Sequence, residues 1–176
     1  MWYPATVTTP ATAEPVTLVE AKRHVRADFE DDDDALSGLI AAARNHAEKY
    51  CGVFLAPQTV AVKADDWCDM AHLPVHPVQS ITSIAYVDSL GAPQTLATTV
   101  YELRDDKIVT KYGQQWPTTQ KQSLITLTAA VGFTALEPAV KHAILIRLAD
   151  LYETRESSDD SKWTSFDSLL SNHRFY

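Results

Sequence analysis

Residues 34–62, DALSGLIAAARNHAEKYCGVFLAPQTVAV, contain the point at which the periodicity of the chain changes. In the first part, apolar residues recur at steps of three and four, which is typical of a helix with one buried face. These residues are Leu36, Leu39, Ile40, Ala43, Ala47 and Tyr50. Gly52 supplies a stop for a helix of about residues 34–50. From Gln58 onward the pattern has period two, so the stretch predicts a helix followed by a β region.

A second, shorter helix is predicted before this stretch, at about residues 17–26. Thr17 and Glu20 have the spacing of a capping box, in which the hydroxyl caps the helix start and the carboxylate reaches back. The acidic run that follows, residues 30–34, suits the positive end of the next helix dipole, with Asp32 or Asp33 as its N-cap. Residues 1–15 are rich in Thr, Pro and Ala and are expected to form an extended arm.

The middle eighty residues are predicted to form an antiparallel β unit. β-branched and aromatic residues alternate with polar ones between turn signals, and five strands are expected, at residues 59–62, 81–87, 100–103, 107–110 and 124–128. Residues 88–91 and 104–107 are expected to be hairpin turns, because Asp and Gly tolerate the backbone angles of a reversal.

The helical period returns at Pro138, which occupies a favoured first-turn position. The apolar residues of this third helix, which runs to about Glu156, are Val140, Ala143, Ile144, Leu148, Leu151 and Tyr152. After a polar break at residues 157–161, Ser165 is expected to cap a short helix. The sequence thus predicts the α+β class, with an N-terminal arm (1–15), a helical body (16–56 and 137–164), a β insertion (57–136) and a C-terminal arm (165–176).

Composition excludes several classes of function. The chain has 176 residues, with 15 Lys and Arg against 23 Asp and Glu, and a net charge of −8. A negative net charge opposes binding to a phosphate backbone, so tight nucleic-acid binding is disfavoured. Two cysteines are too few for a disulfide scaffold, which fits a reducing cytoplasm. The start of the chain does not resemble a signal peptide, and no apolar run is long enough to span a membrane.

Cys68, His72 and His76, with Asp65, Asp66 and Asp69 nearby, are the best metal-ligand candidates. A helix would align the first three, but Pro74 and Pro77 prevent one there, so a loop entering a strand is preferred. No metal and no cofactor are therefore expected.

Motifs of catalysis are also scarce. The sequence has no Gly-x-Ser-x-Gly elbow, no His-Glu-x-x-His and no Gly-rich phosphate loop, and it has only five glycines. We therefore expect a protein that is not an enzyme.

Aromatic residues gather at both ends of the chain, and they are Trp2, Tyr3, Trp163, Phe166, Phe175 and Tyr176. Aromatic side chains are favoured as interface anchors. Two interpretations stay open at this point: the ends dock on a partner, or they fold back onto the body of the chain.

Several ordered motifs together resemble one family. PVTLVEAK (15–22), the acidic approach to 34–44, EKYCG (48–52) and LPVHPVQSITSIAYVD (73–88) are followed by Gly91, Tyr101, Trp116-Pro117, AAVGF (129–133), LYETRE (151–156), Leu169-Leu170 and Arg174. The chain resembles the head-tail connector proteins, also called adaptor or head-completion proteins, of long-tailed bacteriophages, in the branch with a β insertion. In the tail, His173 and the added Phe175 and Tyr176 depart from that pattern, and the arm with Trp2 and Tyr3 lies outside the match.

The resemblance implies a viral structural protein of the virion neck, made in the cytoplasm of the bacterial host. It implies a dodecameric ring beneath the portal that offers a platform to the next neck protein, with DNA passing through the lumen as cargo. The alternatives are another neck component, such as a stopper or tail-completion protein, and a soluble metal-assisted hydrolase using His72 and His76.

Two sets of residues are expected to serve this role in assembly. Candidates for contact with a partner or another copy are Trp2, Tyr3, Trp163, Phe166, Leu169, Leu170, Arg174, Phe175 and Tyr176. Candidates for acids that line the lumen and repel the duplex are Asp31, Asp32, Asp33, Asp34, Asp105 and Asp106. Burial of Phe166, Leu169 and Leu170 against a neighbour or the portal is expected to drive assembly.

Overall fold

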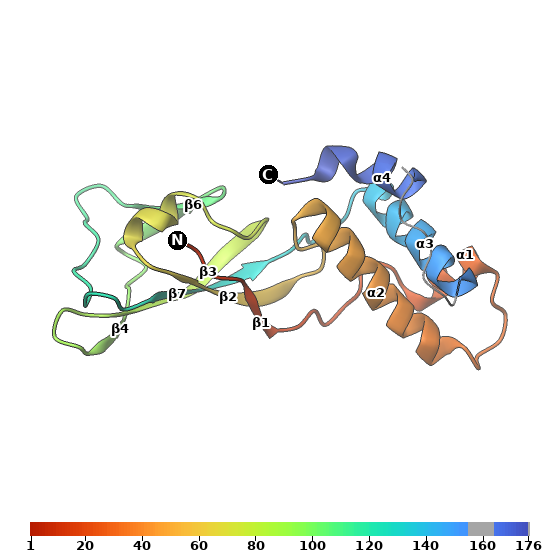
Figure 1. The fold of residues 1–176 in the computed structure, drawn as a ribbon, viewed down its shortest axis with the longest axis horizontal. Coiled ribbons are helices and arrows are strands. Elements are labelled where there is room, and N and C mark those ends of the chain that lie inside the picture. Colours follow the sequence, from red (N-terminus) through yellow and green to blue (C-terminus); the bar gives the residue numbers. More distant parts are fainter. Residues whose placement is uncertain (155–163, 176) are drawn as a thin grey trace. The chain divides into compact units, whose positions relative to one another are not determined.

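The computed structural model describes residues 1–154 and 164–175, and the chain folds as two compact units. We call Met1–Thr12 with Pro57–Gly132 the β unit, and Ala13–Ala56 with Phe133–Tyr176 the helical unit. Figure 1 shows strands in the first and helices in the second. The α+β class predicted from the sequence is confirmed.

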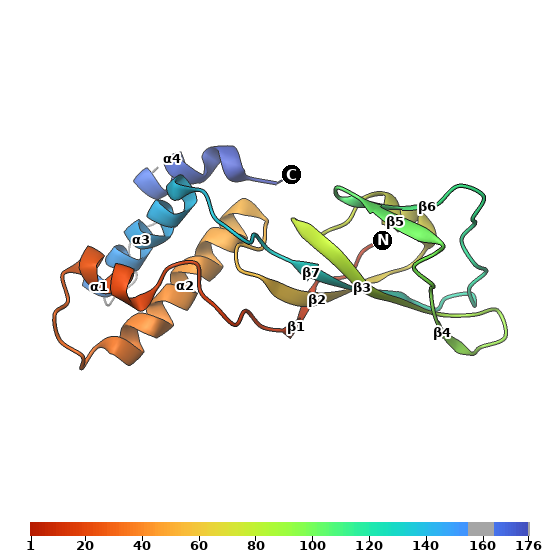
Figure 2. The same ribbon diagram turned by 180° about the vertical axis from the view of Figure 1, so that it is seen from behind.

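The main sheet of the β unit has five antiparallel strands in the order β1-β2-β7-β3-β4. Their bounds are β1 (Thr6–Thr9), β2 (Gln58–Ala64), β3 (Val78–Val87), β4 (Pro93–Thr95) and β7 (Ile125–Val131). A separate hairpin of β5 (Tyr101–Arg104) and β6 (Lys107–Thr110) is seen side by side in Figure 2.

Alternation along β2 and β7 builds the apolar face of the sheet. Val60, Val62 and Ala64 of β2 are buried, and they lie opposite Ala129, Leu127 and Ile125 of β7, which are buried as well. Since side chains on a strand alternate between faces, one register aligns all the apolar pairs, and a one-residue slip would expose them.

A short 3-10 helix, η1 (Trp67–Ala71), contacts both β2 and β6. Trp67 is buried and stacks on Trp116 with ring centroids 4.8 Å apart, and its Nε1 donates to the carbonyl oxygen of Pro117 at 2.9 Å. Trp67 therefore fixes the chain that follows β6 against the β unit.

Two features of the β unit differ from the sequence-based expectation. The first turn, residues 88–91, joins β3 to β4, a strand that the pattern missed because all three of its residues are exposed. Residues 6–9, expected in a separate arm, form edge strand β1 on β2 and belong to the β unit. A local pattern of Thr and Pro does not specify this pairing, which depends on a partner strand far along the chain.

The helical unit contains α1 (Leu18–Val25), α2 (Asp33–Cys51), α3 (Pro138–Glu153) and α4 (Ser165–Leu170), followed by η2 (Ser171–His173). The predicted capping box of α1 is confirmed: the backbone N–H of Glu20 donates to Thr17 Oγ1 at 3.3 Å, and that of Thr17 donates to Glu20 Oε2 at 2.9 Å. Asp32 occupies the N-cap position of α2. The cap of α4 is Thr164 and not Ser165.

Helices α1, α2 and α3 contact one another, and α4 contacts α2 and α3. Their apolar faces form one core, whose largest fully buried side chains are Leu36, Ile144, Leu148, Leu170 and Val16. Among the described residues, no helix has both the length and the apolar composition of a membrane-crossing segment.

Arg44 of α2 forms a partly buried ion-pair network, and its side chain is only 11% exposed. Its Nε and Nη2 donate to the two carboxylate oxygens of Glu14 at 2.7 and 3.2 Å, and its Nη1 donates to Glu48 at 2.9 Å. Glu48 Oε1 also accepts from the backbone N–H of Leu55 at 2.8 Å. Although partial burial opposes the charge, the two carboxylates raise the pKa of Arg44.

We predict that Arg44→Met lowers the free energy of unfolding by about 2–3 kcal/mol, because two shielded carboxylates lose their cation. Lys49→Met, which removes an exposed cation from the same helix, is the control and should change it by no more than about 0.5 kcal/mol. Urea unfolding followed by circular dichroism measures both. Equal, small effects would show that the network does not stabilise the fold.

Glu20 is predicted to contribute stability that depends on pH. Hydrogen bonds from Lys141 and Thr17 lower the pKa of this carboxyl from 4.5 to about 2. A lowered pKa means that the contribution is complete above the ordinary value of 4.5 and is lost as the pH falls through about 2. The melting temperatures of wild type and Glu20→Gln should therefore differ at pH 6 and converge toward pH 2. A difference that does not change with pH would contradict the pairing.

Candidate interaction surfaces

Trp2 and Tyr3 are held by the β unit of their own chain. Trp2 Nε1 donates to the carbonyl oxygens of Asp69 and His72 at 3.1 and 2.7 Å. The Tyr3 hydroxyl donates to Asp65 at 3.1 Å, and this bond raises the pKa of Tyr3. Of the two interpretations left open for the N-terminal residues, the structure favours folding back.

Two of the acids among the candidate metal ligands, Asp66 and Asp69, have a structural role in the fold. Asp66 and Asp69 form a capping box at η1, with the backbone N–H of Asp66 donating to Asp69 Oδ2 at 3.1 Å. Cys68 lies on this short helix and is exposed. In residues 1–154 and 164–175, no three His, Cys, Asp or Glu side chains are arranged to hold a metal ion.

The C-terminal candidates divide into buried and accessible residues. Phe166 and Leu170 are 4% and 0% exposed because they pack into the core of the helical unit. This corrects the expectation that their burial against a neighbour or the portal drives assembly, since almost no apolar surface of these two side chains remains to be buried. Leu169 is half-buried, and Trp163 and Tyr176 lie outside the described residues.

The last residues lie against the end of α2. The backbone N–H of Phe175 donates to the carbonyl oxygen of Cys51 at 2.8 Å, and the Arg174 guanidinium lies 5.1 Å from the centre of the Tyr50 ring. Gly52 has φ of +71°, and a Cβ there would meet the Phe175 carbonyl oxygen at 3.1 Å. Glycine is thus required twice, for the left-handed helix end and for the close approach of the C-terminal segment.

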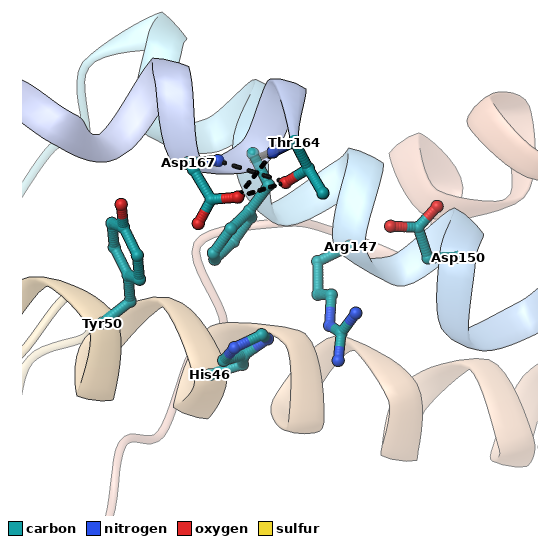
Figure 3. A pocket seen from close by; sticks show the side chains of 7 residues that line it. His46, Tyr50, Arg147, Asp150, Thr164 and Asp167 are labelled. Carbon is teal, nitrogen blue, oxygen red and sulfur yellow. Dashed lines mark hydrogen bonds between the residues drawn. The ribbon is translucent and has the colours of Figure 1, made fainter. Parts of the chain in front are cut away.

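A groove of about 250 Å³ lies among α2, α3 and α4. Figure 3 shows His46 and Tyr50 on α2 across from Thr164 and Asp167 on α4, with Arg147 and Asp150 on α3. Phe166, the seventh lining residue, stacks on His46 with centroids 5.0 Å apart.

The electrostatics of this groove are mixed. Although partial burial works in the opposite direction, hydrogen bonds from Thr164 and Tyr50 lower the pKa of Asp167. Burial and the nearby Asp167 raise the pKa of Tyr50. The Thr164 hydroxyl donates to Asp167 Oδ2 at 2.7 Å, so this acid serves the cap of α4. The residues that line the groove thus help to hold α4 in place.

The acids expected to line a lumen fall into two groups, one in each unit. In the helical unit, Asp33 pairs with Lys22 at 2.6 Å and Asp32 accepts a bond from the Tyr152 hydroxyl at 2.8 Å, whereas Asp31 and Asp34 are exposed. In the β unit, Asp105 is exposed in the β5–β6 turn and Asp106 is half-buried. Two of the six acids therefore have structural partners.

Sequence reasoning missed three exposed apolar features. Val19, in the first turn of α1, and Phe29, in the segment after this helix, are 60% and 78% exposed. Leu90 is 92% exposed at the tip of the β3–β4 turn. The Leu90 turn is firmly built, because Asp88 Oδ1 accepts from the backbone N–H groups of Leu90 and Ala92 at 2.9 and 3.0 Å.

Tyr112 is the third of these features and is fully exposed after β6. None of the exposed apolar residues could be singled out locally, because exposure depends on how the helices and strands pack.

Part of the sequence matches a known protein family. Residues 15–88, which contain α1, α2, β2 and β3, match the family model of the phage gp6-like head-tail connector protein. The resemblance predicted from the sequence motifs is thus confirmed over these residues. No curated protein matches the sequence at a significant level.

Solved structures extend the similarity to nearly the whole chain. A chain in the neck of an empty GTA particle, computed with C6 symmetry, has a TM-score of 0.83 at 20% identity, covering 99% of this chain and 96% of that one. A chain in the virion of a native gene transfer agent particle has a TM-score of 0.82 at 22% identity, with 98% and 95% covered.

A chain in the neck of the native GTA particle, computed with C12 symmetry, has a TM-score of 0.79 at 20% identity, with 99% and 96% covered. The protein therefore has the fold of these chains.

We predict that Phe166→Ala lowers the free energy of unfolding by about 3 kcal/mol, since it leaves a cavity under α4. It should also speed thiol labelling of Cys51, which is buried and whose pKa burial raises to about 11. The measurement uses Cys68→Ser protein, so that Cys51 is the sole thiol. Leu169→Ala, at a half-buried neighbouring position, should cost only about 1 kcal/mol and leave labelling slow. Unchanged protection in Phe166→Ala would contradict the docking of α4.

Proposed function

We propose that the protein is a structural component of a phage virion that forms a ring adaptor between the portal of the head and the neck or tail. The match of residues 15–88 to the head-tail connector family carries this proposal. The similarity in fold to chains from GTA necks supports it over nearly the full length. A neck computed with C12 symmetry agrees with a ring of twelve copies.

The arrangement of the candidate metal ligands and of the exposed apolar side chains favours a role in assembly over one in catalysis. A metal-assisted hydrolase using His72 and His76 is less well supported, because in residues 1–154 and 164–175 no three His, Cys, Asp or Glu side chains are arranged to hold a metal ion. Phe29 and Tyr112 are exposed, and aromatic side chains are enriched at protein–protein interfaces. The partners of the chain in this role are other copies of itself, the portal and the next neck protein.

Passage of DNA is compatible with the charge of the chain. A net charge of −8 would repel a duplex from the wall of a ring, whereas a basic wall would hold phosphates. Asp31, Asp34 and Asp105 are the exposed members of the acidic set and are the better candidates for such a wall.

The proposal predicts binding to the portal as a closed ring. Negative-stain images of the purified chain, mixed with portal complexes of the same particle, should show an added ring of about twelve copies at one end of the portal. Native mass spectrometry of the complex gives the copy number.

The control in this experiment is a preparation of heads that already carry their adaptor. A stopper would bind these heads and not the bare portal, and that result would replace the adaptor proposal. A chain that binds neither preparation but hydrolyses a substrate, with activity lost in His72→Ala, would overturn the structural role altogether.

A further inference from the structure

The outward face of α1 is a surface with both apolar and basic character. Val19 and Arg23 lie one turn apart on α1, and Arg26, the C-cap of this helix, lines the same groove as both; we call these three residues the α1 ridge. Val19 is 60% exposed and both arginines are exposed. In the described part of the chain, no ion pair engages either arginine within the fold.

Ion pairs on both flanks of α1 turn this ridge away from its own bundle. On one side, Glu20 pairs with Lys141 of α3 at 2.6 Å. On the other side, Lys22 pairs with Asp33 at the start of α2, also at 2.6 Å. Because α1 is held at both flanks, the ridge between them stays accessible.

The ridge borders an open groove of about 680 Å³, lined by Val19, Lys22, Arg23, Arg26, Ala27 and Asp28. Arg26 ends α1 with φ of 56°, a left-handed conformation in which glycine is usual. Cations in the last turn also offset the helix dipole, but this does not account for the exposed valine beside them or for Phe29, which is 78% exposed.

Helix α3 carries a complementary row on its surface. Ile146, Asp150 and Glu153 follow at steps of four and three, and we call them the α3 ridge. Ile146 is half-buried, and Asp150 and Glu153 are exposed. Each ridge thus has one apolar residue followed by two charged residues. The charged residues are arginines in the α1 ridge and carboxylates in the α3 ridge.

We propose that neighbouring copies of this chain associate by pairing the α1 ridge of one copy with the α3 ridge of the next. In a parallel arrangement, Val19 would meet Ile146, and the two arginines would meet the two acids. The two ridges lie on different helices of one unit, so the contact is head-to-tail, and a head-to-tail contact generates a ring when its rotation closes. This inference rests on the ring proposed above.

Charge reversal on each ridge tests the pairing. In Arg23→Glu/Arg26→Glu both ridges are acidic, and in Asp150→Arg/Glu153→Arg both are basic. Each variant alone should associate at least about tenfold more weakly than wild type, because like charges then meet at the contact. Sedimentation velocity at low salt, over a range of protein concentrations, measures the association.

An equimolar mixture of the two variants is the decisive measurement. Every contact between unlike variants would again join an acidic ridge to a basic one, so the mixture should recover association and form assemblies with an even number of alternating copies. Native mass spectrometry distinguishes the two chains by mass. Two variants that had merely failed to fold could not rescue one another.

Lys49→Glu/Lys63→Glu changes the net charge by the same amount as Arg23→Glu/Arg26→Glu does, at exposed positions outside both ridges, and it should associate as wild type does. If wild type forms rings but either charge-reversed variant associates equally well alone, the ridge pairing is wrong and the ring proposal stands. A wild-type chain that stays monomeric, both free and on the portal, would overturn the ring and with it this inference.

Discussion

The ion-pair network of Arg44 holds together the parts of the helical unit that adjoin the β unit in sequence. Glu14 follows closely after the first crossing of the chain between the units, at residues 12 and 13, and Leu55 precedes the second crossing, at residues 56 and 57. Arg44 binds the first directly and the second through Glu48, which accepts the backbone N–H of Leu55. The chain therefore enters and leaves the helical unit at positions that one guanidinium holds together. A shielded, bidentate arginine is suited to this because its planar donors match the carboxylate.

Much of the fold could be predicted from local pattern, and the exceptions share one physical cause. The stripe of α2 and the alternation of β2 and β7 are properties of consecutive residues, so the period reveals them. The capping box of Thr17 and Glu20 is equally local. Strands β1 and β4 have only exposed residues, so they carry no apolar alternation and exist because a neighbouring strand offers hydrogen bonds. Such pairing is decided by tertiary context.

The interaction surfaces were less predictable, for a related reason. An aromatic residue has the same composition signal whether it is buried or exposed, and Phe166 proved to be core while Phe29 and Tyr112 proved to be exposed. Arg44 and Glu48 lie off the apolar stripe of α2, yet both side chains are only 11% exposed. What distinguishes these cases is the packing of elements distant in sequence, which no local window contains.

The acidity of the chain bears on how copies of it could assemble. Copies that each carry a net charge of −8 repel one another over distances set by the ionic strength, so association needs a contact in which charges of opposite sign meet locally. A basic row and an acidic row on two different helices meet this need without neutralising the remainder of the surface, which keeps its net negative charge. The same arrangement rejects wrong contacts, since two α3 ridges or two α1 ridges would repel. Charge in this protein would thus favour one orientation of neighbouring copies, while apolar contacts such as Val19 against Ile146 would contribute to the affinity.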